Sequence, residues 1–206
     1  MKYCLPKDLI VFISGVPGAG KTTLSYELLK KHNEFRLIEE TDIIREILRG
    51  YQMHLASIGI DVPNDIASHD VFLDYEAAAR QCRIMKASIV NIVQRQQRKD
   101  IPTIINGVHV IPEVLCDSLP SSSTMYINLF ISSEEVLWTR LRNRNPAKYK
   151  KEYVPLLYQT NIDLRNRTLQ LTSKHLNVIS LNIGTNTINE LLTEIEDLFY
   201  RLYGVD

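Results

Sequence analysis

Residues 15–22 read GVPGAGKT, a full match to the pattern GxxxxGK[ST]. An apolar, β-branched run at 9–13 precedes them and predicts a strand buried on both faces. The stretch that follows, up to His32, repeats leucines at helical spacing. Glycines in such a turn let successive backbone N–H groups point at phosphate oxygens where the helix begins. Strand, glycine-rich turn and helix together predict a site for a purine nucleoside triphosphate.

The side chains of this phosphate-binding loop (P-loop) have distinct expected roles. Lys21 is expected to reach the β- and γ-phosphates, the Thr22 hydroxyl to bind Mg²⁺, and Thr23 to bond the α-phosphate. ATP and Mg²⁺ are therefore the expected cofactors. The residues of this stretch expected to hold the nucleotide are Gly15, Val16, Pro17, Gly18, Ala19, Gly20, Lys21, Thr22 and Thr23. The alternative interpretation is a tight glycine turn that carries a lysine by chance.

The rest of the chain alternates between strand and helix patterns. Further strands are predicted at 35–39, 101–106, 125–131 and 177–181. Helices are predicted at about 42–48 with Gly50 as the stop, at 69–98, from a capping box of Ser132 and Glu135 to Arg144, at 153–173, and after a capping box of Thr187 and Glu190. Residues 51–67 are expected to form a long loop. This order predicts the three-layer α/β P-loop NTPase fold, with a five-stranded parallel sheet and helices on both faces.

Composition narrows the classes of partner. The 206 residues include 24 basic and 24 acidic side chains, and this lack of net charge argues against nucleic acid as a partner. No apolar stretch is long enough for a signal peptide or a membrane span, so we expect a cytoplasmic protein with no membrane contact. Cys4, Cys82 and Cys116 are expected to be reduced thiols. The length predicts a single domain over 1–206, as a monomer or homodimer.

P-loops occur in GTPases, motor ATPases and small kinases, so other residues must distinguish these classes. The sequence contains no NKxD guanine motif, and no predicted strand ends in an apolar run followed by Asp. Asp42, just after the second predicted strand, is the candidate to take a proton from an acceptor hydroxyl or to hold a Mg²⁺-bound water. Arg45, one helical turn later, is the candidate ligand of an anionic acceptor. The alternative is an N-cap aspartate with a solvent-facing arginine.

The segment 134–144 reads EEVLWTRLRNR and resembles the start of the lid in adenylate-kinase-like enzymes, where a VLxxRLxxR pattern puts two arginines on one helix face. The resemblance implies that Arg140 stacks on adenine and that Arg144 contacts phosphate as a catalytic residue. We therefore expect a small lid at about 140–152 and a substrate-side loop and helix at about 42–98. For Arg142 and the lysines at 148–151 the alternative is a solvated basic helix end.

Three stretches in series resemble 2-phosphoglycerate kinase and its relatives among the small P-loop kinases: GxxGxGKTT from Gly15, TDIIREILR from 41 to 49, and GVHVIP from 107 to 112. The resemblance covers most of residues 9–182 and implies that Gly107 and His109 contact the acceptor. Taken alone, His109 would more often be a hydrogen-bonded structural histidine. Where that family tends to have Glu before Gly-Val-His, this chain has Asn106, so a carboxylate near the metal is replaced.

These observations predict an ATP- and Mg²⁺-dependent phosphotransferase that moves the γ-phosphate to a hydroxyl of a small anionic metabolite similar to 2-phosphoglycerate. The nucleotide and a small-molecule substrate are the expected partners. One alternative keeps the reaction and changes the acceptor to a nucleoside, a sugar nucleotide or an RNA 5′ end. A second alternative, of another class, is a nucleotide-dependent switch with weak hydrolysis. The Asp42–Arg45 pair and the lid-like segment favour the enzyme.

Overall fold

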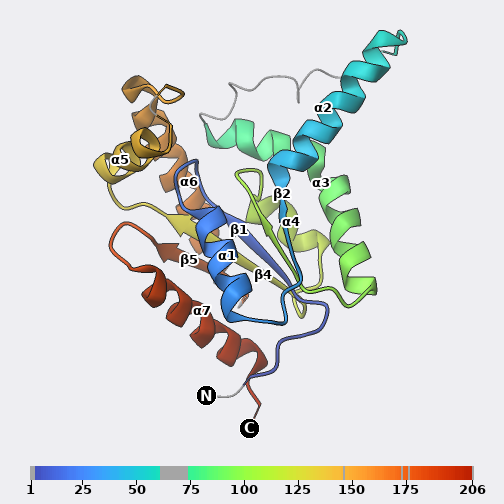
Figure 1. Ribbon diagram of the computed structural model, residues 1–206, viewed down its shortest axis with the longest axis vertical. Helices are drawn as coiled ribbons and strands as arrows, with labels where there is room; N and C mark the ends of the chain where they lie inside the picture. The colour runs from blue at the N-terminus through green and yellow to red at the C-terminus, as the bar shows by residue number, and fades with distance from the viewer. Residues whose placement is uncertain (1–2, 61–73, 146, 173, 176, 206) are drawn as a thin grey trace.

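The computed structural model describes residues 3–60, 74–145, 147–172, 174–175 and 177–205. Its strands are β1 (Ile10–Ser14), β2 (Leu37–Glu40), β3 (Thr103–Asn106), β4 (Thr124–Phe130) and β5 (Val178–Asn182). Its helices are α1 (Lys21–Lys31), α2 (Thr41–Ser57), α3 (Tyr75–Arg98), α4 (Pro112–Leu115), α5 (Glu134–Arg144), α6 (Val154–Thr172) and α7 (Ile188–Tyr203). The strands form one parallel sheet in the order β2-β3-β1-β4-β5, which confirms the predicted fold class (Figure 1).

Strand β1 occupies the centre of the sheet because its side chains are apolar on both faces. All five of its residues are buried, and Ile10 pairs in register with Thr103 on one side and Thr124 on the other. Strand β2, which contains two glutamates, lies at an edge, and Leu37 is exposed. A parallel sheet brings all carboxyl ends to one edge, so the P-loop after β1 and the acidic end of β2 reach the same side of the molecule.

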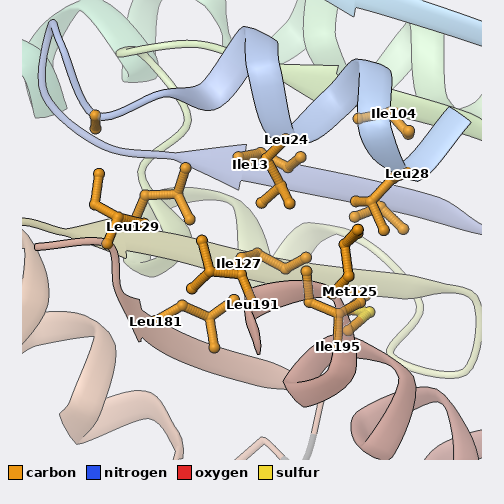
Figure 2. Close-up of a cluster of buried hydrophobic side chains, with 14 of the residues drawn as sticks. Ile13, Leu24, Leu28, Ile104, Met125, Ile127, Leu129, Leu181, Leu191 and Ile195 are labelled. Carbon is orange, nitrogen blue, oxygen red and sulfur yellow. The ribbon is translucent and has the colours of Figure 1, made fainter. Parts of the chain in front are cut away.

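Two apolar clusters cover the two faces of the sheet and make three layers. One cluster joins the sheet to α1 and α7, and Figure 2 shows Leu24 and Leu28 of α1 together with Leu191 and Ile195 of α7 packed on β-strand side chains. The other cluster joins the opposite face to α3, α4 and α6. Among the described residues, no helix is both long and apolar enough to cross a membrane.

Helix α2 differs most from the expectation. It was predicted to end before Gly50, but it continues through Gly50 to Ser57, so residues 51–57 of the predicted loop are helical. A glycine in a helix interior costs only about 1 kcal/mol relative to alanine, and Ile44 and Leu48 on the inner side of α2 pack against the core. Residues 61–67 of the predicted loop and the predicted start of the next helix at His69 lie outside the described residues.

The helix boundaries show which capping predictions hold. Helix α7 begins with the predicted capping box, in which Thr187 and Glu190 bond each other's backbone N–H groups. The capping box predicted from Ser132 and Glu135 does not form at α5: the N-cap is Ser133, whose side chain accepts from the Val136 N–H. The short helix α4 and the 3-10 turn at Cys116–Ser118 were not expected from the sequence.

Candidate active site

A cavity of about 880 Å³ opens at the carboxyl edge of the sheet. Parallel strands, helix N-termini and the chain after α5 converge there, as ligand sites of open α/β sheets commonly do. Its lining is rich in charged and phosphate-compatible groups and consists of Pro17, Gly18, Gly20, Lys21, Thr22, Thr23, Glu40, Asp42, Arg45, Asn106, Gly107, Val108, Arg140, Asn143, Arg144, Lys148, Tyr149, Tyr153 and Leu157. Of the predicted site residues, Gly15, Val16, Ala19 and His109 do not line it.

The P-loop wraps the amino end of α1. Gly20 is the N-cap and takes the left-handed conformation at φ 79°, which glycine adopts without steric cost. Lys21 is buried, and its Nζ donates to the backbone oxygens of Gly15 and Val16 at 2.9 and 3.1 Å. Burial lowers the pKa of Lys21 to about 8, with Asp42 and Glu40 opposing this and Arg144 adding to it. The ammonium is thus held inside a loop of N–H groups suited to phosphate.

A carboxylate not assigned from the sequence lies beside the P-loop threonine. The Thr22 hydroxyl donates to Glu40 Oε1 at 3.3 Å. Hydroxyl and carboxylate oxygens are ligands that Mg²⁺ prefers, with phosphates and waters completing the set. The described residues contain no cluster of three or more His, Cys, Asp or Glu side chains suited to a metal. Thr22 and Glu40 therefore fit a Mg²⁺ ion that shares its coordination with nucleotide phosphates.

The position of Glu40 also accounts for Asn106. Glu40 and Asn106 end the adjacent strands β2 and β3 and are paired in register. Asn106 is buried, and its Nδ2 donates to Ser25 Oγ of α1 at 3.0 Å. Where the resemblance leads one to expect a carboxylate at the end of β3, this chain has Asn106, and the neighbouring strand β2 supplies the Glu40 carboxylate at the paired position. The sequence signal was the position of Glu40 as the last residue of β2, which was missed because the strand was expected to end at Glu39.

Asp42 and Arg45 face the cavity from the first turns of α2. Asp42 is about half exposed, and its Oδ1 lies 3.8 Å from the Arg45 guanidinium. The N-cap of α2 is Glu40, so the alternative interpretation of Asp42 as an N-cap does not hold. Arg45 NH2 also lies 3.2 Å from Glu46 Oε1, whereas its buried Nε has no hydrogen-bond partner among the described residues.

His109 and Gly107 lie in the loop after β3, but only Gly107 lines the cavity. His109 is fully buried, with Nε2 2.7 Å from Gln81 Oε1 and Nδ1 3.2 Å from Thr41 Oγ1. Burial lowers the pKa of His109 to about 4, against the attraction of Asp42, so the ring is neutral at pH 7. His109 thus lies behind the cavity lining, with its Nδ1 also 3.6 Å from Asp42 Oδ1, and its buried hydrogen bonds are those of a structural histidine. Its contact with the acceptor, implied by the resemblance, stays a prediction.

The two arginines predicted to share a face of α5 both reach the cavity. Arg140 lies over Gly20 of the P-loop, and its NH2 donates to the Ile183 carbonyl at 2.9 Å, just after β5. Arg144 is close enough to Lys21 to contribute to its lowered pKa. Sequence reasoning did not assign Asn143, Tyr149, Tyr153 or Leu157, which line the same side. The amide, aromatic and leucine side chains at these positions form no sequence pattern that distinguishes cavity-lining residues from other helix and loop residues.

The cavity has two chemically distinct sides. The P-loop side of the cavity carries groups suited to phosphates, whereas Asp42 and Arg45 face the same space from helix α2, which follows β2. Group-transfer enzymes position two substrates and neutralise charge around one phosphate site, and a cavity with charged groups on both of its sides suits that chemistry. The protein is accordingly a P-loop kinase.

Comparison with known proteins defines the group more narrowly. A family model described as an AAA domain matches residues 11–168, and the chain belongs to that family. It is 23% identical over 141 residues to mevalonate-3-phosphate 5-kinase of Thermoplasma acidophilum, covering 66% of this chain and 67% of that protein. It is 36% identical over 74 residues to cytidylate kinase of Methanosphaerula palustris, covering 36% of this chain and 39% of that protein.

A solved structure shows the same fold. The gluconokinase from Sinorhizobium meliloti 1021 superimposes with a TM-score of 0.56 at 16% identity, covering 96% of this chain and 95% of that chain. The similarity extends over nearly the whole of both chains, so the sheet and its surrounding helices follow one architecture.

Proposed function

We propose that the protein transfers the γ-phosphate of ATP, with Mg²⁺, to a hydroxyl group of a small anionic metabolite. The observation that carries the proposal is the convergence of Lys21, the Thr22–Glu40 pair and the Asp42–Arg45 pair on one cavity. Phosphoryl transfer is catalysed mainly by positioning and by neutralising charge on the transferring oxygens. Each of these side chains supplies one of those two contributions.

The residues divide into a nucleotide side and an acceptor side. Lys21, and Arg144 from α5, offset the negative charge of the β- and γ-phosphates, while Thr22 and Glu40 would hold Mg²⁺, which neutralises charge between those phosphates. Asp42 accepts the proton of the acceptor hydroxyl as that oxygen approaches phosphorus. We also propose that residues 140–152 form a lid that excludes water during transfer, with Arg140 against the base.

An anionic acceptor is supported by Arg45. Its side chain is largely buried, and a buried guanidinium Nε without a partner among the described residues is costly unless a ligand occupies it. A carboxylate or phosphate group satisfies an arginine in two-point geometry. A hydroxy acid or a phosphorylated hydroxy compound similar to 2-phosphoglycerate fits this requirement. The partial similarity to a cytidylate kinase keeps a nucleotide acceptor as the second candidate.

A direct test is a transfer assay with γ-labelled ATP, Mg²⁺ and a panel of acceptors. The panel contains 2-phosphoglycerate, gluconate, mevalonate 3-phosphate and cytidylate. We expect label in one of the first three and none with Lys21→Met. The matched control is Lys30→Met, since Lys30 is exposed on the same helix and pairs only with Glu27 among the described residues. Label in cytidylate alone would favour the nucleotide acceptor, and phosphate release without transfer to any acceptor would refute the proposal.

A further inference from the structure

A chain of buried polar side chains joins α3, the loop after β3 and the start of α2. Gln81, His109 and Thr41 are 3%, 0% and 0% exposed, although all three carry polar atoms. Gln81 Oε1 lies 2.7 Å from His109 Nε2, and His109 Nδ1 lies 3.2 Å from Thr41 Oγ1. Most buried polar groups in proteins are hydrogen-bonded, and a satisfied buried network fixes one arrangement of the elements that contribute to it.

The hydrogen bonds of this chain have a defined direction. Gln81 presents its carbonyl oxygen, which can only accept, so we assign the proton of the neutral imidazole to Nε2. His109 Nδ1 is then an acceptor, the Thr41 hydroxyl donates to it, and Asp42 Oδ1 lies 3.6 Å from the same nitrogen. Each of the three side chains thus has a complementary hydrogen-bond partner. Thr41 is the member of this hydrogen-bonded series that lies on α2.

Close packing reinforces the position of Thr41. A Cβ atom added at Gly107 would overlap Thr41 Oγ1, so the side chain of Thr41 rests directly on the glycine backbone. The amino end of α2 has no side-chain cap of its own, since Glu40 makes no capping hydrogen bond. At the start of α2, the side chain of Thr41 therefore makes both a buried hydrogen bond to His109 and a tight contact with the backbone of Gly107.

The residue next to Thr41 is Asp42, and Arg45 follows one turn later, both on the cavity wall. Displacement of reacting groups by about 1 Å can lower a rate about 10²-fold. We infer that Gln81 and His109 are positioning residues, which hold Thr41 and thereby fix Asp42 and Arg45 against the transferring phosphate without contacting substrate themselves. The inference rests on the proposed function for its effect on rate, but not for its effect on the order of α2.

The decisive variant is Thr41→Val, which keeps the shape of the side chain and removes the hydroxyl. We expect kcat/KM for the panel compound that the wild type phosphorylates to fall about 10–10²-fold. The Kd for the nucleotide should stay within about twofold of the wild-type value. Thr41→Ser keeps the donor and should restore most of the rate. Gln81→Met, which removes the acceptor for Nε2, should act in the same direction as Thr41→Val.

Thr168→Val is the matched control, because Thr168 is equally buried but bonds the Leu164 carbonyl within α6. Amide hydrogen exchange over residues 42–45 of the ligand-free protein gives a second reading that needs no acceptor. We expect faster exchange there in Thr41→Val and no change in Thr168→Val. Equal kinetics and equal exchange in these two variants would overturn the inference, as would Thr41→Ser behaving like Thr41→Val. If no panel acceptor is phosphorylated by the wild type, the proposed function fails and the exchange result alone decides the positioning chain.

Discussion

The buried positive charge of Lys21 lowers the free energy of unfolding. Burial lowers its pKa to about 8 from the ordinary value of 10.5, so below pH 8 the ammonium is present in both states but is less favourable in the folded one. We predict that Lys21→Met abolishes transfer and raises Tm at pH 7 by about 2–6 °C, since each kcal/mol moves Tm by about 2–4 °C in a protein of this size. Thermal unfolding checks this, and the gain should vanish above about pH 10.5, where the unfolded lysine is also neutral. A lower Tm for Lys21→Met at pH 7 would contradict it.

Asp42 should affect the chemical step more than nucleotide binding. It faces the cavity from α2, on the far side of β3 from the P-loop strand. Asp42→Asn is expected to lower kcat at least about 10²-fold with a nearly unchanged nucleotide Kd, measured by steady-state kinetics and equilibrium binding. Asp197→Asn, on the exposed side of α7, is the control and should change neither quantity. Loss of nucleotide binding with kcat preserved would move the acceptor site away from Asp42.

At the scale of elements, α2 contains an avoidable weakness at Gly50. Gly50 is helical and exposed, and an added Cβ would contact nothing within 4 Å. Gly50→Ala should therefore stabilise the protein by about 0.5–1 kcal/mol, as measured by denaturant unfolding. Gly59→Ala is the matched comparison, because its Cβ also meets nothing but its φ is 79°. That variant should destabilise, so equal effects of the two substitutions would contradict the conformational explanation.

The end of α5 and the residues after it form the second element with a testable behaviour. Arg140, Arg144, Lys148 and Tyr149 line the cavity from the segment proposed as the lid. Binding of a non-hydrolysable ATP analogue with Mg²⁺ should slow amide exchange over residues 140–152 at least about threefold, as lid closure commonly does. Exchange in α7, which does not line the cavity, should stay unchanged. Identical exchange at 140–152 with and without the analogue would argue against a lid.

At the scale of the whole molecule, an aromatic cluster joins the two ends of the chain. His32 packs edge-on against Phe199 and Phe35 and lies near Tyr3, while Tyr3 bridges to Gly204. Burial lowers the pKa of His32, and Glu196, whose carboxylate lies 3.8 Å away, only partly offsets this. The unfolded chain therefore binds a proton more readily than the folded one, so stability falls as pH drops below about 6.5.

His32→Phe tests this cluster, because it keeps an aromatic ring and removes the titration. We predict that the loss of unfolding free energy between pH 7 and pH 5 is smaller in His32→Phe than in the wild type, measured by denaturant unfolding at both pH values. His175→Phe serves as the control, since His175 follows α6 and makes none of the ring contacts of this cluster. A parallel decline in wild type and His32→Phe would exclude His32 as a source of the acid sensitivity.

Local sequence was sufficient where contacts lie close along the chain. The buried run of β1, the GxxxxGKT loop and the capping box at Thr187 depend on residues within a few positions of one another, and each forms as predicted. The course of α2 through Gly50 was not predictable in this way, because one glycine disfavours the helix by only about 1 kcal/mol and does not by itself end it.

The sequence by itself determined the parallel α/β fold and the phosphate-binding loop, since hydrophobic periodicity and turn geometry are local properties. Only the tertiary structure decided which carboxylate stands beside Thr22 and that His109 is buried against Gln81 and Thr41. Glu40 is 18 residues from Thr22 in the chain, and Thr41 and His109 are 68 residues apart. Such pairings follow from strand order and register, in which β2 lies next to β3 and not next to β1. The physical reason is that burial and long-range hydrogen bonds are fixed only when the layers pack together.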